Sequence, residues 1–177
     1  MSDATHCDLL VVGAGPAGLA AATQAANLGI RTVLLDEQAA PGGQIYRAVG
    51  TTPVQDRAIL GSDYWHGHSL LQPFEQSGAR YLPRSTVWAI NRPGADRFEV
   101  AFSIDGQAQL LYPRHVLLAT GAQERPFPIP GWTLPGVMTV GAAQILLKTA
   151  GLVPDGRVVL AGQGRSEERR VGKECRL

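Results

Sequence analysis

A glycine pattern between two apolar runs constrains the fold of this chain more than any other feature. Its three positions spell G-x-G-x-x-G: Gly13, Gly15 and Gly18. The preceding run, Asp8 to Val12, predicts a parallel strand that is buried on both faces. The alanine-rich stretch Ala17 to Leu28 predicts a helix that stops at Gly29, and Thr32 to Leu35 predicts the next strand. This order predicts a Rossmann-like α/β domain, in which helices flank a parallel sheet.

Each glycine has its own task in such a unit. Gly13 makes the tight turn from strand to helix, Gly15 lets the backbone approach a pyrophosphate, and Gly18 lets helix and strand pack closely. The helix that begins near Pro16 and Ala17 directs its positive dipole end at the phosphates. We therefore include both residues in the predicted dinucleotide site.

An acidic residue ends the second predicted strand. Asp36 follows Gly18 by about 18 positions, close to the ~20 expected for the acid that binds a ribose hydroxyl. An acid at this place favours an unphosphorylated ribose. Glu37 is the alternative for the same role, and Asp36 is preferred because of its register.

Composition excludes several classes of function. The 177 residues carry a net charge of +1 with interspersed charges, which gives no reason to expect nucleic acid or an anionic membrane as partner. The chain has no stretch of about 18 apolar residues for a membrane span. The two cysteines, Cys7 and Cys175, have neither metal-ligand nor disulfide-framework spacing, so we expect no metal site and a cytoplasmic location.

Residues further along decide which dinucleotide is bound. The turn Pro41 to Gln44 contains Gly42 and Gly43, which would let the backbone come near a ligand. The apolar strand Val116 to Ala119 is followed by Thr120 and Gly121 and then by a proline-rich stretch. This segment resembles the A-T-G-x-x-x-R-P-x-x-P-x-x-G motif of the flavoproteins with two dinucleotide-binding domains, which include glutathione and thioredoxin reductases. The resemblance implies FAD as cofactor, with Thr120 and Gly121 beside the flavin.

The segment between these motifs predicts a helix and several short strands. Leu70 to Ser77 predicts a helix and Arg80 to Leu82 a short strand. Three alternating runs predict a small antiparallel β insertion at about residues 84–112: Thr86 to Ile90, Arg97 to Ser103 and Gln107 to Tyr112. Asp105 and Gly106 mark a hairpin turn. The resemblance implies that the backbone near Val87 reaches the adenine, and a purely structural role for Val87 stays open.

Further motifs are similar to a narrower group, the A subunits of opine oxidases and the B subunit of hydrogen cyanide synthase. They are Asp36-Glu37-Gln38, Pro41 to Arg47, Asp63 to Gly67, Leu134 to Thr139 and Gly141 to Gln144. The resemblance implies a subunit that handles FAD and electrons beside a second flavoprotein subunit, in the oxidation of a small-molecule amine or amino-acid derivative. No Cys-x-x-Cys or Cys-x-x-x-x-Cys pair is present, which excludes a disulfide-reductase mechanism.

Two alternatives remain open from the residues themselves. One is an NAD(P)H-dependent flavoprotein reductase, and the other is a non-catalytic FAD-binding or electron-relay subunit. Flavin chemistry needs few side chains, so no catalytic residue is assigned. Gln44, Tyr46, Arg47 and His66 are candidates to line the flavin or the substrate, and each can equally be a residue of a packed loop.

The last part of the chain begins like a second dinucleotide unit and then departs from it. Arg157 to Leu160 predicts a strand, and Gly162 and Gly164 predict a second phosphate loop of NAD(P) type. Glu167 stands where the third glycine belongs, and Ser166 to Arg176 resembles the in-frame translation of a sequencing adapter.

We therefore expect three parts in the chain. Residues 1–134 form the N-terminal portion of an FAD-binding domain, residues 135–164 start a second domain of NAD(P) type, and residues 165–177 are a non-native tail. In the flavoproteins that this chain resembles, a later segment returns to the FAD-binding domain and completes its sheet. Without that segment, one edge of the sheet stays unpaired. We accordingly expect this chain alone to be poorly stable, to bind FAD weakly and to be inactive.

Overall fold

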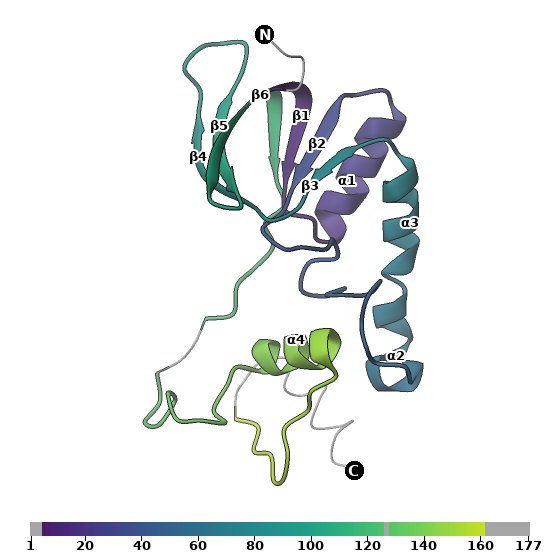
Figure 1. Ribbon diagram of the computed structural model, residues 1–177, viewed down its shortest axis with the longest axis vertical. Helices are drawn as coiled ribbons and strands as arrows, with labels where there is room; N and C mark the ends of the chain where they lie inside the picture. Colours follow the sequence, from purple (N-terminus) through teal and green to yellow (C-terminus); the bar gives the residue numbers. More distant parts are fainter. Residues whose placement is uncertain (1–4, 126–127, 162–177) are drawn as a thin grey trace.

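The computed structural model describes residues 5–125 and 128–161. Within these residues six strands form one sheet in the order β3-β2-β1-β6-β5-β4 (Figure 1). The strands are β1 (His6–Val12), β2 (Thr32–Leu35), β3 (Arg80–Leu82), β4 (Ser85–Asn91), β5 (Glu99–Ile104) and β6 (Gln107–Leu118). The helices are α1 (Pro16–Asn27), α2 (Arg57–Trp65), α3 (His68–Gln76) and α4 (Val140–Ala150). The expected α/β fold with a parallel sheet and a small antiparallel insertion is confirmed.

One long strand joins the two halves of the sheet. The first part of β6 pairs antiparallel with β5, and its second part, from Tyr112 to Leu118, pairs parallel with β1. The sequence predicts two separate strands here, but the structure has one. Pro113 lies where the pairing changes, and there its carbonyl accepts a hydrogen bond from the N–H of Phe98 (2.8 Å). The β insertion is thus continuous with the parallel sheet.

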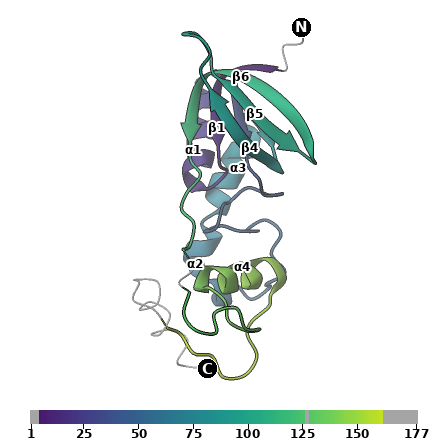
Figure 2. The same cartoon turned by 90° about the vertical axis from the view of Figure 1, so that its left-hand side faces the viewer.

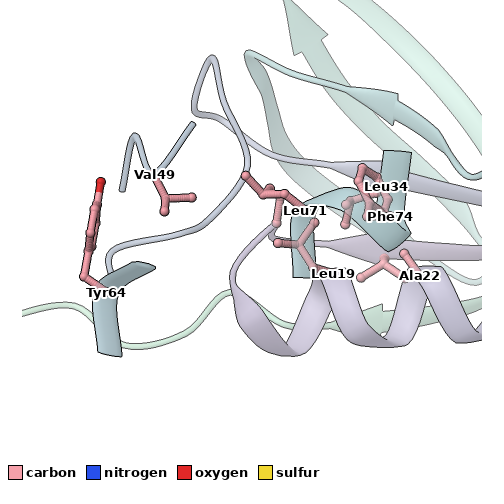
Figure 3. Packing of buried hydrophobic residues seen from close by; sticks show 9 residues of the cluster. Leu19, Ala22, Leu34, Val49, Tyr64, Leu71 and Phe74 are labelled. Atoms are coloured by element: carbon pink, nitrogen blue, oxygen red, sulfur yellow. The ribbon is translucent and has the colours of Figure 1, made fainter. Parts of the chain in front are cut away.

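Two hydrophobic cores lie on opposite faces of the parallel strands. Alternate residues such as Val11 and Leu34 face α1 and α3, whereas Leu10 and Leu35 face the β4-β5-β6 insertion. Figure 1 shows the insertion on one side of the parallel strands and α1 and α3 on the other, and Figure 2 views the molecule from the side of the insertion. Figure 3 shows side chains of the first core: Tyr64 and Val49 lie at one end, and the others gather beside α1, namely Leu19, Ala22, Leu34, Leu71 and Phe74.

The hairpin between β5 and β6 follows its sequence signal. Asp105 has φ 49° and Gly106 has φ 79°, so both central residues are in the left-handed region that a type I′ turn requires. The predicted hairpin turn is confirmed. It sets the register in which Ile104 pairs with Gln107.

Two helices arise where the sequence analysis assigns none. α2 is interrupted by Gly61 (φ 74°), and this break obscures its helical period. α4 has ordinary end signals, because the Thr139 hydroxyl accepts the Ala142 N–H (3.3 Å) and Gly151 ends the helix at φ 66°. Figure 1 places α4 away from the sheet and next to α2.

The strand predicted at Arg157 to Leu160 is wrong. These residues have no assigned secondary structure, and Val158 and Val159 are exposed. Among residues 128–161 no second strand offers them a hydrogen-bonding partner, and a buried parallel strand requires one. The predicted second loop at Gly162 and Gly164 and the tail 165–177 lie outside the described residues.

Candidate functional site

A cleft of about 570 Å³ opens at the carboxyl ends of β1, β2 and β6, the edge where open α/β sheets bind ligands. Most of the predicted site residues line it: Gly13, Gly15, Pro16, Ala17, Asp36, Glu37, Gly43, Gln44, Arg47, Val87, Thr120 and Gly121. Residues that sequence reasoning missed complete the lining: Val12, Leu35, Gln38, Ile45, Ser85, Thr86, Ala119, Ala122 and Gln123. Most of these flank a predicted residue in the chain.

The turn after β1 depends on two glycines. Gly13 has φ 104° and donates its N–H to the carbonyl of Leu35 (2.7 Å). A Cβ atom on Gly18 would overlap the carbonyl oxygen of Gly13. Gly18 does not line the cleft, and its part is the close packing of α1 on the turn.

The two glycine motifs meet at the cleft. A Cβ atom on Gly43 would lie 2.7 Å from the Cα atom of Gly15, and one on Gly15 would have only the Cα atom of Gly43 near it, at 3.9 Å. Gly42 donates its N–H to the carbonyl of Ala14 (2.8 Å), which holds the second motif against the first. Gly42 itself does not line the cleft, because it is packed against Tyr46.

Asp36 fastens the end of β2 to the phosphate-loop side of the cleft. One carboxylate oxygen accepts the N–H of Ala14, and the other accepts the N–H of Gln38 (2.7 Å). Each oxygen has a second lone pair, so a further donor in the cleft can still bind there. Glu37 is exposed and lines the cleft beside it.

Arg47 brings a positive charge to the cleft. Its Nε atom is buried and has no hydrogen-bond partner within the described protein. Its backbone carbonyl accepts the Tyr64 hydroxyl (2.7 Å), and burial raises the pKa of that hydroxyl. A buried donor without a partner is costly, so this nitrogen is a candidate to donate to a group from outside the described protein.

Two loops meet on the β6 side of the cleft, the loop after β2 and the loop after β6. The Gln44 side-chain amide donates to the carbonyl of Ala122 (3.4 Å), just past Thr120 and Gly121. Gly121 has φ 72°, which turns the chain away from the sheet after β6. The residues predicted to lie beside a flavin are therefore on the β6 side of the cleft. Asp36 and Glu37 follow β2, on the other side of β1.

Two candidates, Tyr46 and His66, are not among the lining residues. The ring of Tyr46 packs on Gly67 so closely that a Cβ atom there would come within 2.6 Å of the ring. His66 lies beside Arg57 and Trp65 at a shallow surface depression, where its ring nitrogen is 3.4 Å from the Ser69 hydroxyl. The structure therefore places neither residue in the lining of the cleft: Tyr46 is packed against Gly67, and His66 is exposed.

The described residues contain neither a metal site nor a membrane span. No group of three or more His, Cys, Asp or Glu residues there could hold a metal ion. In the same part of the chain, no helix is both long and apolar enough to cross a membrane.

Comparison with known proteins decides the family. The model of the pyridine nucleotide-disulphide oxidoreductases matches residues 7–164. The chain belongs to this family. The family comprises FAD-dependent oxidoreductases, so the cleft lies in a flavoprotein fold.

Curated relatives confirm the narrower resemblance. The A subunit of opine oxidase from Agrobacterium tumefaciens (strain Ach5) is 52% identical over 161 residues, 89% of this chain and 32% of the relative. Hydrogen cyanide synthase subunit HcnB of Pseudomonas aeruginosa is 36% identical over 155 residues, 88% of this chain and 33% of the relative. The chain spans about a third of the length of these members of the family.

Solved structures share the fold. L-proline dehydrogenase from P. horikoshii has a TM-score of 0.70 at 18% identity and covers 84% of this chain and 29% of its own. Thioredoxin reductase from Streptococcus pyogenes MGAS5005 has a TM-score of 0.53 at 27% identity, covering 71% of this chain and 38% of its own.

Proposed function

We propose that the cleft binds FAD and that the chain is the FAD-binding portion of a dehydrogenase for amines or amino-acid derivatives. The meeting of Gly15 and Gly43 carries this proposal. Gly15 is the N-cap of α1 and lines the cleft, so the backbone at the helix start faces the cleft with no side chain of its own. A helix start with an exposed backbone binds phosphate groups well.

Arg47 supports the same assignment by its charge. Its buried Nε atom has no partner in the described protein, and it lines the cleft with Gly15 and Ala17. A guanidinium next to a helix N-terminus suits a diphosphate, because charge-assisted hydrogen bonds to phosphate are strong. The pyrophosphate of FAD is such an anion.

The remaining residues divide along the cleft. Asp36, or Glu37, is assigned to the adenosine ribose, and the backbone at Val87 to the adenine. Gln44, Thr120 and Gly121 are assigned to the flavin end. The isoalloxazine, when bound, accepts a hydride itself, so the chain's own residues bind it, orient it and exclude water.

The names of the relatives support the substrate class and the partner. Several relatives are subunits of opine oxidase or hydrogen cyanide synthase. We accordingly propose that the substrate is an opine-like amino-acid derivative and that the partner is a second flavoprotein subunit. In this scheme residues 1–134 belong to the FAD-binding domain, and residues 135–164 begin an NAD(P)-type domain.

The FAD assignment is tested by a substitution that adds one methyl group at a glycine lining the cleft, Gly15. Gly15→Ala places a Cβ atom into space at a φ of −73°, which alanine tolerates. Gly94→Ala is the matched control, because a Cβ atom there meets nothing within 4 Å and Gly94 is not a lining residue. Binding is measured by the quenching of FAD fluorescence, and folding by circular dichroism.

We expect FAD binding by the unsubstituted chain and by Gly94→Ala, and at least tenfold weaker binding by Gly15→Ala, a loss of about 1.4 kcal/mol. A folded chain that binds no FAD would overturn the proposal. Equal binding by all three proteins would place FAD elsewhere.

The substrate class needs a separate measurement. The FAD-loaded protein, with its partner subunit, is mixed anaerobically with an opine and, separately, with NADH. Bleaching of the visible flavin band by the opine is the expected result. Bleaching by NADH alone would show that the protein is an NADH-dependent reductase instead.

A further inference from the structure

Lys148 is a buried ammonium that contacts the backbone of a loop lining the cleft. Only 4% of the residue is exposed, although it is the single charged residue of helix α4. Its Nζ atom donates to the backbone carbonyls of Gln44 (3.1 Å) and Ile45 (2.6 Å). Both of these residues line the cleft. A cation from α4 therefore holds the backbone of the loop that forms one end of the site.

Tyr64 extends this contact to the rest of the loop. The Lys148 Nζ atom lies 5.3 Å from the centre of the Tyr64 ring, within the range of a cation–π interaction. The hydroxyl of the same ring donates to the carbonyl of Arg47. Lys148 thus holds the loop at Gln44 and Ile45, and the Tyr64 hydroxyl holds it separately at Arg47.

The helix that carries Lys148 is itself fastened to the cleft. The Glu124 carboxylate accepts the N–H of Gly141 at the start of α4, at 3.1 and 2.9 Å for its two oxygens. Glu124 lies two positions after Ala122, whose carbonyl accepts the Gln44 side chain. The contacts form a closed ring from Gln44 to Ala122, through Glu124 to α4, and through Lys148 back to Gln44. In both Figure 1 and Figure 2, α4 lies beside α2 and below the sheet.

Burial of an ammonium is costly unless hydrogen bonds replace its water. Two carbonyls and an aromatic face provide that replacement here, so the loop and the cation depend on each other. Without the cation, the carbonyls of Gln44 and Ile45 would lose their partner and the loop would relax. The Asp36 carboxylate is held separately, by the backbone N–H groups of Ala14 and Gln38.

We propose that Lys148 is a positioning residue for the flavin end of the cleft, and that α4 is thereby part of the FAD site. This rests on the proposed FAD binding. Lys148 touches backbone rather than cofactor, and it acts by holding Gln44 and Ile45 in place. The adenosine end is independent of it.

The test compares two ligands that share one half. FAD occupies the whole cleft, whereas ADP carries only the adenosine and the diphosphate. Lys148→Met keeps the length of the side chain and removes the charge and the donors. Thr149→Ala is the control on the same helix, because Thr149 is exposed and its hydroxyl bonds only within α4. Calorimetric titration gives both dissociation constants for each protein.

We expect Lys148→Met to weaken FAD binding about tenfold, since hydrogen bonds to charged groups stabilise by that order. ADP binding should stay within about twofold, because the Tyr64 hydroxyl still holds Arg47 at the diphosphate. Thr149→Ala leaves both unchanged. Unchanged FAD binding in Lys148→Met overturns the positioning role, and so does an equal loss for both ligands. Absence of FAD binding by the unsubstituted chain overturns the proposed function as well.

A second variant covers the case in which Lys148→Met does not fold. Glu124→Ala loosens the other end of α4 from an exposed position that does not line the cleft. It should weaken FAD binding severalfold and spare ADP. Equal affinities for FAD in Glu124→Ala and the unsubstituted chain would then overturn the role of α4.

Discussion

Gly15 and Gly43 lie face to face, so that a Cβ atom on Gly43 would come within 2.7 Å of the Cα atom of Gly15. The first glycine belongs to the turn after β1 and the second to the loop after β2. Their contact closes one wall of the cleft with backbone alone. Two motifs that are separate in sequence are therefore one structural unit, and each limits what the other can tolerate.

The first prediction measures that contact. Gly43→Ala should destabilise the fold in two ways: a left-handed φ of 62° costs alanine about 1–2 kcal/mol, and the clash with Gly15 adds roughly 1–3 kcal/mol. Gly78→Ala is the control, because Gly78 has a similar φ of 80° and open space around it. Urea unfolding should show a clearly lower midpoint for Gly43→Ala. Equal midpoints would mean that the two loops separate at little cost.

The second prediction separates binding from stability at Arg47. Removal of its unpartnered buried Nε in Arg47→Met should leave the stability of the ligand-free chain unchanged or raise it. FAD binding should weaken about tenfold and lose part of its salt dependence, because a charged contact to phosphate is gone. Arg114→Met, at an exposed arginine outside the cleft, is the control. Thermal melts measure stability, and FAD titrations at two salt concentrations measure binding. A lower Tm with unchanged FAD affinity in Arg47→Met would show that Arg47 has a structural role only.

Local sequence signals predicted the fold where each signal is sufficient by itself. The strand-turn-helix unit around Gly13 and the turn at Asp105 need only their own residues to be recognised. The strand predicted at 157–160 shows the limit, because an apolar run becomes a strand only beside a partner strand. Gly61 hid α2 by breaking its helical period.

The candidate site was predictable as far as it consists of motifs at strand ends. Parallel strands bring their carboxyl ends to one edge, and this rule is enough to place Asp36 and Thr120 at the same edge of the sheet. Lys148 was not expected, because its partners are backbone carbonyls about 100 positions away. One signal was available: Lys148 is the single charged residue among residues 140–150.

The third prediction distinguishes the two acids after β2. Asp36→Asn replaces one of two acceptors for backbone N–H groups with a donor, so the chain should lose about 2 kcal/mol of stability. FAD binding should weaken about tenfold as well. Glu37→Gln is the matched change at an exposed neighbour, and stability should stay within about 0.5 kcal/mol. If FAD affinity instead falls only in Glu37→Gln, Glu37 is the ribose-binding acid and Asp36 a purely structural one.

The last prediction concerns Cys7, which is buried between β1 and the β insertion. Burial, with a smaller effect of the Asp8 charge, raises the pKa of its thiol from 9.0 to about 11. Because the folded-state pKa is the higher one, the unfolded chain loses the thiol proton first. The free energy of unfolding therefore keeps its full value below about pH 9 and falls as the pH rises toward 11. At pH 8 the thiolate fraction is about a hundredfold lower than in the unfolded chain, so iodoacetamide should alkylate Cys7 at least a hundredfold more slowly in the folded protein. Peptide mass spectrometry of the folded and the urea-unfolded chain measures both rates, and similar rates would show that β1 and the insertion separate readily.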